Sequence, residues 1–187
     1  MSLFQTLKPK PKSQNSSTCL LLDVSGSMGE YIVAEEGLEV RRIDQMFKVV
    51  RETPECGGLK AFAFSNDCWP LEVIPSENDH FASRSSTDLA RAFATVKAAG
   101  FFSAILVTDG EPDNEALALQ EAQGMKLGII YIGNPPVPSF LERLAKATDG
   151  TFALADMRSD DQLKIALIHA LPPPDAVTPE TEKVIKL

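Results

Sequence analysis

The stretch Cys19-Leu20-Leu21-Leu22-Asp23-Val24-Ser25-Gly26-Ser27-Met28-Gly29 decides the fold of this chain, because it joins an apolar run to a polar loop. Four apolar residues in succession, 19 to 22, are typical of a strand that is covered on both faces, as in a parallel sheet. The run stops at Asp23, and Gly26 allows a tight turn. The stretch therefore predicts a buried strand that ends in a polar loop at one edge of a sheet.

The loop carries oxygen-bearing side chains at alternate positions, namely Asp23, Ser25 and Ser27. Oxygen ligands without His or Cys are suited to a hard divalent cation such as Mg²⁺ or Mn²⁺, and they argue against zinc. An alternative interpretation needs no ion: aspartates can cap helices, and serine or threonine hydroxyls can bond to nearby backbone. The pattern alone leaves both interpretations open.

The DxSxS pattern of Asp23, Ser25 and Ser27 resembles the signature of von Willebrand factor A-type (VWA) domains, which carry a metal-ion-dependent adhesion site. In that family a threonine on a later loop and an aspartate after a later strand complete the site. Thr87, within Ser-Ser-Thr-Asp-Leu, and Asp109, within Leu-Val-Thr-Asp-Gly, occur in the matching order. The resemblance covers roughly residues 16 to 171.

The resemblance implies that Ser25, Ser27 and Thr87 are direct ligands of Mg²⁺, Mn²⁺ or Ca²⁺. It implies that Asp23 and Asp109 bind the ion directly or through water. If hydroxyls hold the ion and carboxylates lie one water away, the ion remains electrophilic and keeps one position for an outside anion. A Glu or Asp from a partner protein is the expected anion.

Apolar runs alternate with amphipathic segments along the rest of the chain. Strands are expected at about 18–24, 59–65, 69–74, 104–108, 127–132 and 151–155, and helices at about 41–53, 88–99, 138–148 and 160–171, with a short helix within 112–124. Strands that alternate with helices imply right-handed crossovers and a mainly parallel sheet. We expect an α/β fold: a doubly wound, mainly parallel six-stranded sheet with helices on both faces, Rossmann-like as in VWA domains, with one antiparallel edge strand.

The length of 187 residues favours one domain. Residues 1–17 are expected to be a flexible leader, 18–171 the VWA-like domain, and 172–187 an exposed Pro-rich tail. Aspartates 88 and 113 are expected in the first turns of helices, where the helix dipole favours acids, with support of the metal ligands as the alternative.

Residues 29–40 look like an insertion beside the polar loop. Their glutamates suggest two interpretations. Either Glu35, Glu36 or Glu39 acts as a lid that fills the vacant metal position until a partner displaces it, or the segment is a solvated acidic loop.

The composition restricts the partners and the compartment. The net charge is -8, and the few basic residues are dispersed, so nucleic acid is not an expected partner. The first 18 residues lack an apolar core of the signal-peptide type, and no apolar stretch approaches membrane-span length. An odd number of cysteines, three, fits a reducing compartment. These features predict a cytoplasmic protein, monomeric on its own, without membrane association.

The leading functional hypothesis is a metal-dependent protein–protein interaction module and not an enzyme. By resemblance, its partners would include an AAA+ ATPase or a stress-response or metal-resistance assembly. A second hypothesis is a Mg²⁺-dependent phosphohydrolase with Asp23 as nucleophile, but Ser25 occupies the position of the usual general acid and no basic residue is expected near the site. A third is a metal-independent scaffold whose site is vestigial.

Overall fold

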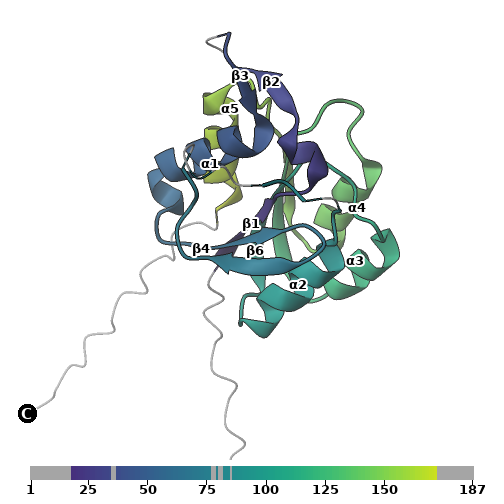
Figure 1. Cartoon of the computed structure of the whole chain (residues 1–187). Helices are drawn as coiled ribbons and strands as arrows, with labels where there is room; N and C mark the ends of the chain where they lie inside the picture. The colour runs from purple at the N-terminus through teal and green to yellow at the C-terminus, as the bar shows by residue number, and fades with distance from the viewer. Residues whose placement is uncertain (1–17, 35–36, 77–78, 80–81, 85, 172–187) are drawn as a thin grey trace, which may run out of the picture.

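The computed structural model describes residues 18–34, 37–76, 79, 82–84 and 86–171, and the predictions on residues 1–17, Glu35, Glu36 and 172–187 lie outside this part. Its centre is a six-stranded sheet in the order β5-β4-β1-β6-β7-β8 (Figure 1). The strands are β1 (Thr18–Asp23), β4 (Lys60–Phe64), β5 (Cys68–Leu71), β6 (Ser103–Thr108), β7 (Lys126–Tyr131) and β8 (Thr151–Leu154). All neighbours are parallel except β4 and β5.

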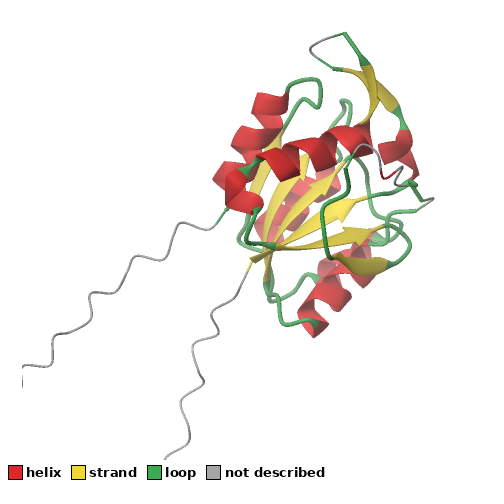
Figure 2. Cartoon of the chain, turned by 60° about the vertical axis from the view of Figure 1, so that its left-hand side comes forward, coloured by secondary structure: helices red, strands yellow, loops and turns green. Residues whose placement is uncertain are grey.

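Helices cover both faces of the sheet (Figures 1 and 2). The α-helices are α1 (Arg42–Glu52), α2 (Leu89–Ala98), α3 (Glu115–Glu121), α4 (Ser139–Ala147) and α5 (Asp160–Ala170), and short 3-10 turns lie at η1 (Gly26–Gly29) and η2 (Pro54–Cys56). Side chains of α1 and α5 pack in one core, and those of α2, α3 and α4 pack in the other. Alternate residues of β1 reach the two cores: Leu20 and Leu22 the first, Cys19 and Leu21 the second. This explains why the run is apolar at every position.

The predicted fold class is confirmed: the sheet has six strands, is mainly parallel, and carries β5 as its antiparallel edge strand. The strand predicted at 69–74 is shorter than expected and ends at Leu71. Leu71 pairs with Ala61, which lies near the start of β4, so β4 offers almost no further backbone to pair with. The sequence pattern showed the strand but not where its partner begins.

The predicted insertion is a β-hairpin, which the sequence analysis did not foresee. Strands β2 (Tyr31–Val33) and β3 (Glu39–Arg41) pair antiparallel, with Ile32 opposite Val40, and form a separate two-stranded sheet. The hairpin rises beyond the main sheet at the top of Figure 1. Glu39 is exposed on β3.

All three cysteines are buried and unpaired. Burial raises the pKa of the Cys19 and Cys68 thiols to about 12 and that of Cys56 to about 11, so the reactive thiolate is scarce near neutral pH. We expect none of the three to react with a disulfide reagent in the native protein between about pH 7 and about pH 9, and all three to react in denaturant. A thiol titrated under native conditions would contradict this prediction.

Candidate metal centre

The candidate site lies at the carboxyl ends of two adjacent central strands. Strand β1 pairs in parallel with β6, with Leu22 opposite Val107, so the residues that follow both strands emerge at the same edge of the sheet. Asp23 ends β1, and Asp109 follows β6 directly. The chain turns sharply into η1 after Ser25, which keeps Ser27 close to the strand end. Ligands of open α/β sheets collect at this edge.

Three predicted ligands are in contact, and we call Ser25, Ser27 and Asp109 the oxygen cup. The Oγ atoms of Ser25 and Ser27 are 3.3 Å apart, and the Ser27 hydroxyl donates to Asp109 Oδ1 at 2.7 Å. Ser25 and Asp109 are buried, whereas Ser27 is partly exposed and so connects the cup to solvent. The fold therefore gathers oxygen atoms from two chain segments 82 residues apart.

Asp23 is completely buried beside the cup. Its Oδ1 accepts from the Ser25 backbone N–H at 2.8 Å, and its Oδ2 accepts from the Thr108 hydroxyl at 2.5 Å. Burial raises the pKa of Asp23 to about 7, although the hydrogen bonds from Thr108 and Ser25 act in the opposite direction. Thr108 is a site residue that the sequence analysis missed, because a threonine within a buried strand has no pattern of its own.

Thr87 reaches the same edge through its backbone. Its carbonyl accepts from the Asp113 N–H at 3.0 Å, and its own N–H donates to Asp113 Oδ1 at 3.4 Å. Upstream on the same loop, the Arg84 N–H donates to the Val24 carbonyl at 2.7 Å. The loop that carries Thr87 is therefore bonded both to the loop after β1 and to the loop after β6.

The two expected helix acids behave differently from each other. Asp88 caps α2, where its carboxylate accepts from the Arg91 N–H at 3.0 Å. The expectation of Asp113 in a first turn is wrong: Asn114 caps α3, and Asp113 precedes the helix and bonds to Thr87 instead. Loop-to-loop pairing, which a local pattern does not reveal, decides the role of Asp113.

The expectation that no basic residue lies near the site is also wrong. The side chain of Arg42, the first residue of α1, is only 5% exposed, and its Nη1 donates to Asp109 Oδ2. The same Nη1 donates to the Ser27 carbonyl at 3.0 Å, and Nη2 lies 3.5 Å from Glu30 Oε2. Arg42 was missed because the hairpin, absent from the sequence-based prediction, determines where α1 begins relative to the cup.

The donor set of the oxygen cup fits a hard cation. Ligands about 2.1 Å from an octahedral Mg²⁺ lie about 3 Å from their neighbours, and the separations of 2.7 and 3.3 Å within the cup bracket that value. Within the described ranges, no group of three or more His, Cys, Asp or Glu side chains is arranged for a metal. An ion here would therefore depend on hydroxyls as well as carboxylates, and the ligand roles stay predictions.

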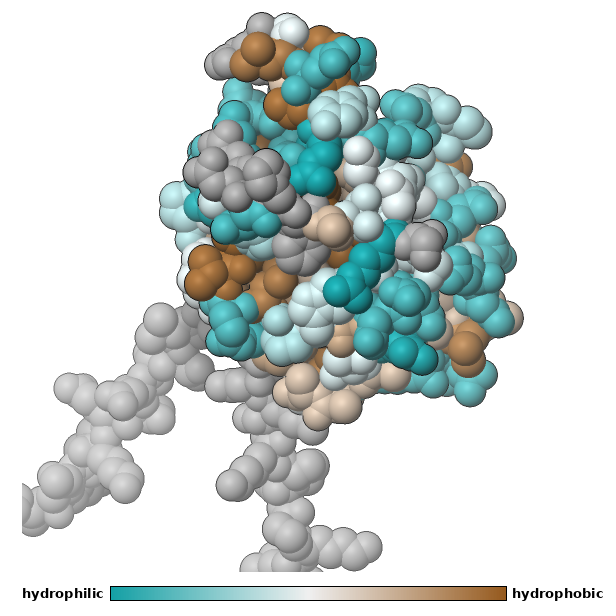
Figure 3. Space-filling view, in the orientation of Figure 1, coloured by the Kyte–Doolittle hydropathy of each residue, from teal (hydrophilic) through white to brown (hydrophobic). Residues whose placement is uncertain are grey.

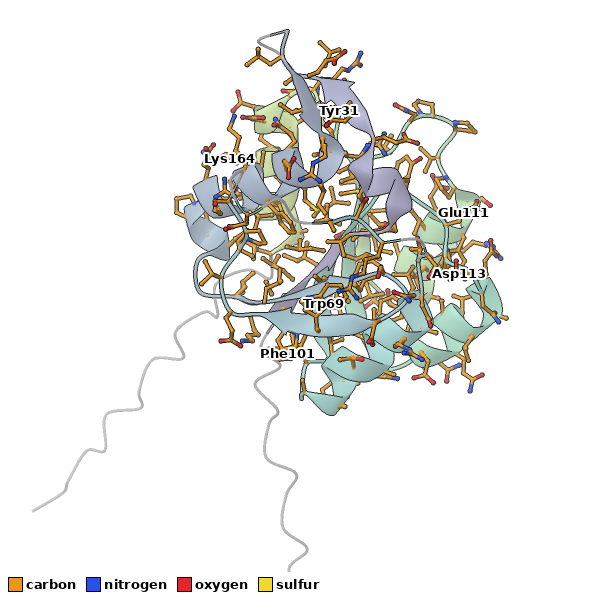
Figure 4. All side chains as sticks on the ribbon, viewed as in Figure 1. Tyr31, Trp69, Phe101, Glu111, Asp113 and Lys164 are labelled. Atoms are coloured by element: carbon orange, nitrogen blue, oxygen red, sulfur yellow. The ribbon has the colours of Figure 1, made fainter. Side chains whose placement is uncertain are left out.

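A hollow of about 570 Å³ adjoins the site, between the hairpin and the ends of β7 and β8. Arg42 and Glu30 are among the residues that line it. Three exposed apolar side chains also line it, and we call them the apolar rim: Tyr31, Val33 and Leu154, with 69%, 53% and 59% of their surfaces exposed. Figure 3 shows apolar side chains on the hairpin, and Figure 4 labels Tyr31 there.

Comparisons with known proteins agree with this architecture. No protein-family model matches the chain. The human protein von Willebrand factor A domain-containing protein 3A is 26% identical over 159 residues; the match covers 73% of this chain and 13% of that protein. The chain thus corresponds to a small part of that relative.

Two solved structures share the fold. The SpRpn10 VWA domain has a TM-score of 0.55 and 12% identity, over 82% of this chain and 94% of that one. A von Willebrand factor type A structure from Catenulispora acidiphila has a TM-score of 0.58 and 17% identity, over 83% of this chain and 42% of that one. None of the helices in the described ranges combines the length and the apolar character of a membrane span. The chain has the von Willebrand factor A fold, as the order of its strands, its helical layers and these similarities together show.

Proposed function

We propose that this chain is a divalent-metal-dependent protein–protein interaction module. Ser25, Ser27 and Thr87, with Asp23 and Asp109, would hold Mg²⁺, or Mn²⁺ or Ca²⁺ in its place. A Glu or Asp carboxylate of a partner protein would complete the coordination. The observation that carries the proposal is the contact among Ser25, Ser27 and Asp109, whose oxygen separations suit an octahedral ion.

The chain's own residues would orient the site. Thr108 and the Ser25 N–H each hold one oxygen of Asp23, so this carboxylate is fixed before an ion arrives. Ser27 does the same for Oδ1 of Asp109. When bound, the ion would supply a positive charge that attracts a partner carboxylate, and the partly exposed Ser27 marks the side from which the carboxylate can approach.

The apolar rim supports a protein as the ligand. Exposed apolar side chains beside a polar centre are typical of protein-binding surfaces. The hollow is lined by Tyr31, Val33 and Leu154 and also by Arg42. The Arg42 side chain in turn donates to Asp109 of the cup. The favoured partner segment therefore carries one acidic residue flanked by apolar residues.

A hydrolytic function is less compatible with this geometry. A phosphohydrolase nucleophile needs an oxygen that substrate can reach, whereas Asp23 is fully buried and both of its oxygens accept hydrogen bonds. We therefore propose that the module is not an enzyme.

A metal-independent scaffold is the second candidate, and a specific observation favours it. Arg42 already places a positive charge on Asp109, and a fixed guanidinium could attract a partner carboxylate without an ion. Binding that survives chelation would distinguish this candidate from the metal-dependent one.

We further propose a cytoplasmic setting and a monomeric module. The three buried, unpaired cysteines support a reducing compartment. An AAA+ ATPase or a stress-response or metal-resistance assembly remains the proposed class of partner, as the family resemblance implied.

Chelation is expected to abolish partner binding. A pull-down from native lysate should retain a specific partner in Mg²⁺, lose it in EDTA and recover it when Mg²⁺ is restored. Calorimetry on the purified chain should show that Ser27→Ala weakens Mg²⁺ binding by about tenfold or more, because a contact of the cup is lost.

The matched control for Ser27→Ala is Ser103→Ala, a change of the same kind. Ser103 begins β6, so it lies at the opposite end of the strand from the cup. Ser103→Ala should leave metal and partner binding unchanged. Partner binding that is equal with Mg²⁺ and with EDTA would contradict the metal-dependent function and favour the scaffold.

A further inference from the structure

The guanidinium of Arg42 is a permanent positive charge built into the candidate metal centre. Its side chain is 5% exposed, and its partner Asp109 has a side chain that is 0% exposed, so water screens the pair weakly. Arginine stays protonated throughout the physiological pH range. The cup therefore already holds one cation when no metal is bound.

This charge occupies the carboxylate oxygen of Asp109 that does not accept from the Ser27 hydroxyl. Asp109 Oδ1 accepts from Ser27, and Oδ2 accepts from Arg42. The same guanidinium also donates to the backbone carbonyl of Ser27, so it touches two members of the cup. A divalent ion and Arg42 must share one carboxylate, and each positive charge weakens the hold of that carboxylate on the other.

A second acid lies within reach of the guanidinium. Glu30 Oε2 is 3.5 Å from Arg42 Nη2, and the Glu30 side chain is 65% exposed. Among the residues that the structure describes, none forms a hydrogen bond with the buried Nε of Arg42. The guanidinium is thus incompletely satisfied where it lies, and it has an alternative carboxylate nearby.

We propose that Arg42 competes with the divalent cation for Asp109 and thereby sets the metal affinity of the site. This inference rests on the proposed function. The metal-free cup is held by an internal cation, and a metal ion has to displace part of the interaction between Arg42 and Asp109 before it binds. A doubly charged ion gains more from Asp109 than the singly charged guanidinium does, so the competition favours divalent over monovalent ions.

The test is calorimetric titration of the purified chain with Mn²⁺ in wild type, Arg42→Gln, Arg42→Lys and Arg41→Gln. Arg42→Gln removes the charge and should tighten Mn²⁺ binding by about tenfold or more, which corresponds to about 1.4 kcal/mol. Arg42→Lys keeps the charge and should remain within a few-fold of wild type.

Arg41→Gln is the matched control. It removes the same charge one residue away, where the partly buried side chain pairs with Asp44. It should change the affinity for Mn²⁺ by less than about twofold, because the Arg41 charge is paired with Asp44, which is not a member of the cup.

The outcomes separate this inference from the proposed function. Competition is supported if Arg42→Gln binds Mn²⁺ more tightly than wild type does, or if Arg42→Gln binds Mn²⁺ and wild type does not. Equal or weaker binding by Arg42→Gln, with wild type still binding, overturns competition and leaves the metal-dependent function in place. No binding by any of the four proteins overturns both.

A measurement on the wild-type protein covers the case in which Arg42→Gln does not fold. The side-chain Nε–H resonance of Arg42, assigned by its absence from the spectrum of Arg42→Lys, should shift during titration with Mg²⁺ and follow the binding curve. An Arg42 resonance that stays unmoved at saturation would show that the guanidinium keeps its contacts, and would overturn competition.

Discussion

Asp109→Ala is expected to lower the free energy of unfolding of the metal-free protein by about 3 to 5 kcal/mol, because it leaves the buried guanidinium of Arg42 without its carboxylate. Within the described part of the chain, the guanidinium also contacts the Ser27 carbonyl and the more distant, exposed Glu30, which compensate only in part. A loss of this size is a large share of the stability of a typical domain. Chemical denaturation in EDTA measures it.

A double-mutant cycle isolates the ion pair. Arg42→Met together with Asp109→Ala removes both charges, so the double variant should lose less stability than the sum of the two single losses, by about 2 kcal/mol or more. Glu111→Ala, which removes an exposed carboxylate two residues away, should change stability by less than about 0.5 kcal/mol. Additive losses in the cycle would show that the two buried charges do not stabilise each other.

Gly150→Ala is expected to destabilise the fold by about 3 kcal/mol or more, because there is no space for a side chain. A Cβ at position 150 would lie 1.8 Å from the carbonyl oxygen of Leu127 and 2.8 Å from its carbonyl carbon. These are backbone atoms at the start of β7, which pairs with β8 from Gly128 and Thr151 onward. The substitution must push the edge strand away from the sheet.

Gly58→Ala is the control for this prediction. Apart from its two chain neighbours, no described residue has an atom within 4 Å of a Cβ at position 58, so the free energy of unfolding of the variant should lie within about 0.5 kcal/mol of wild type. Thermal or denaturant unfolding of wild type, Gly150→Ala and Gly58→Ala compares their free energies of unfolding. A Gly150→Ala variant as stable as Gly58→Ala would mean that β8 can move away from β7 at little cost.

The sequence by itself determined the class of fold. The apolar run 19–22 indicated a strand buried on both faces, and each of its side chains does lie in one of the two cores. The alternation of strands and helices then predicted the parallel sheet, and the Asn66-Asp67 turn between two successive strands predicted its antiparallel edge. These predictions succeed because burial on two faces and the spacing of apolar residues leave local patterns. The DxSxS loop was visible for the same reason, since its three oxygen-bearing residues are neighbours in the chain.

Tertiary structure alone decided how the site is completed. Arg42, Thr108 and Asp113 take part through contacts across 67, 85 and 26 positions of the chain, and no local pattern connects them with their partners. The absence of a side chain at position 150 likewise matters only because β7 passes close by. Local patterns specify which segments become strands and helices. The positive charge in the cup, in contrast, depends on the hairpin, because the hairpin places the start of α1, and with it Arg42, beside Asp109. The physical reason is that hydrophobic burial is periodic along a chain, while the pairing of a buried charge is fixed by proximity in space.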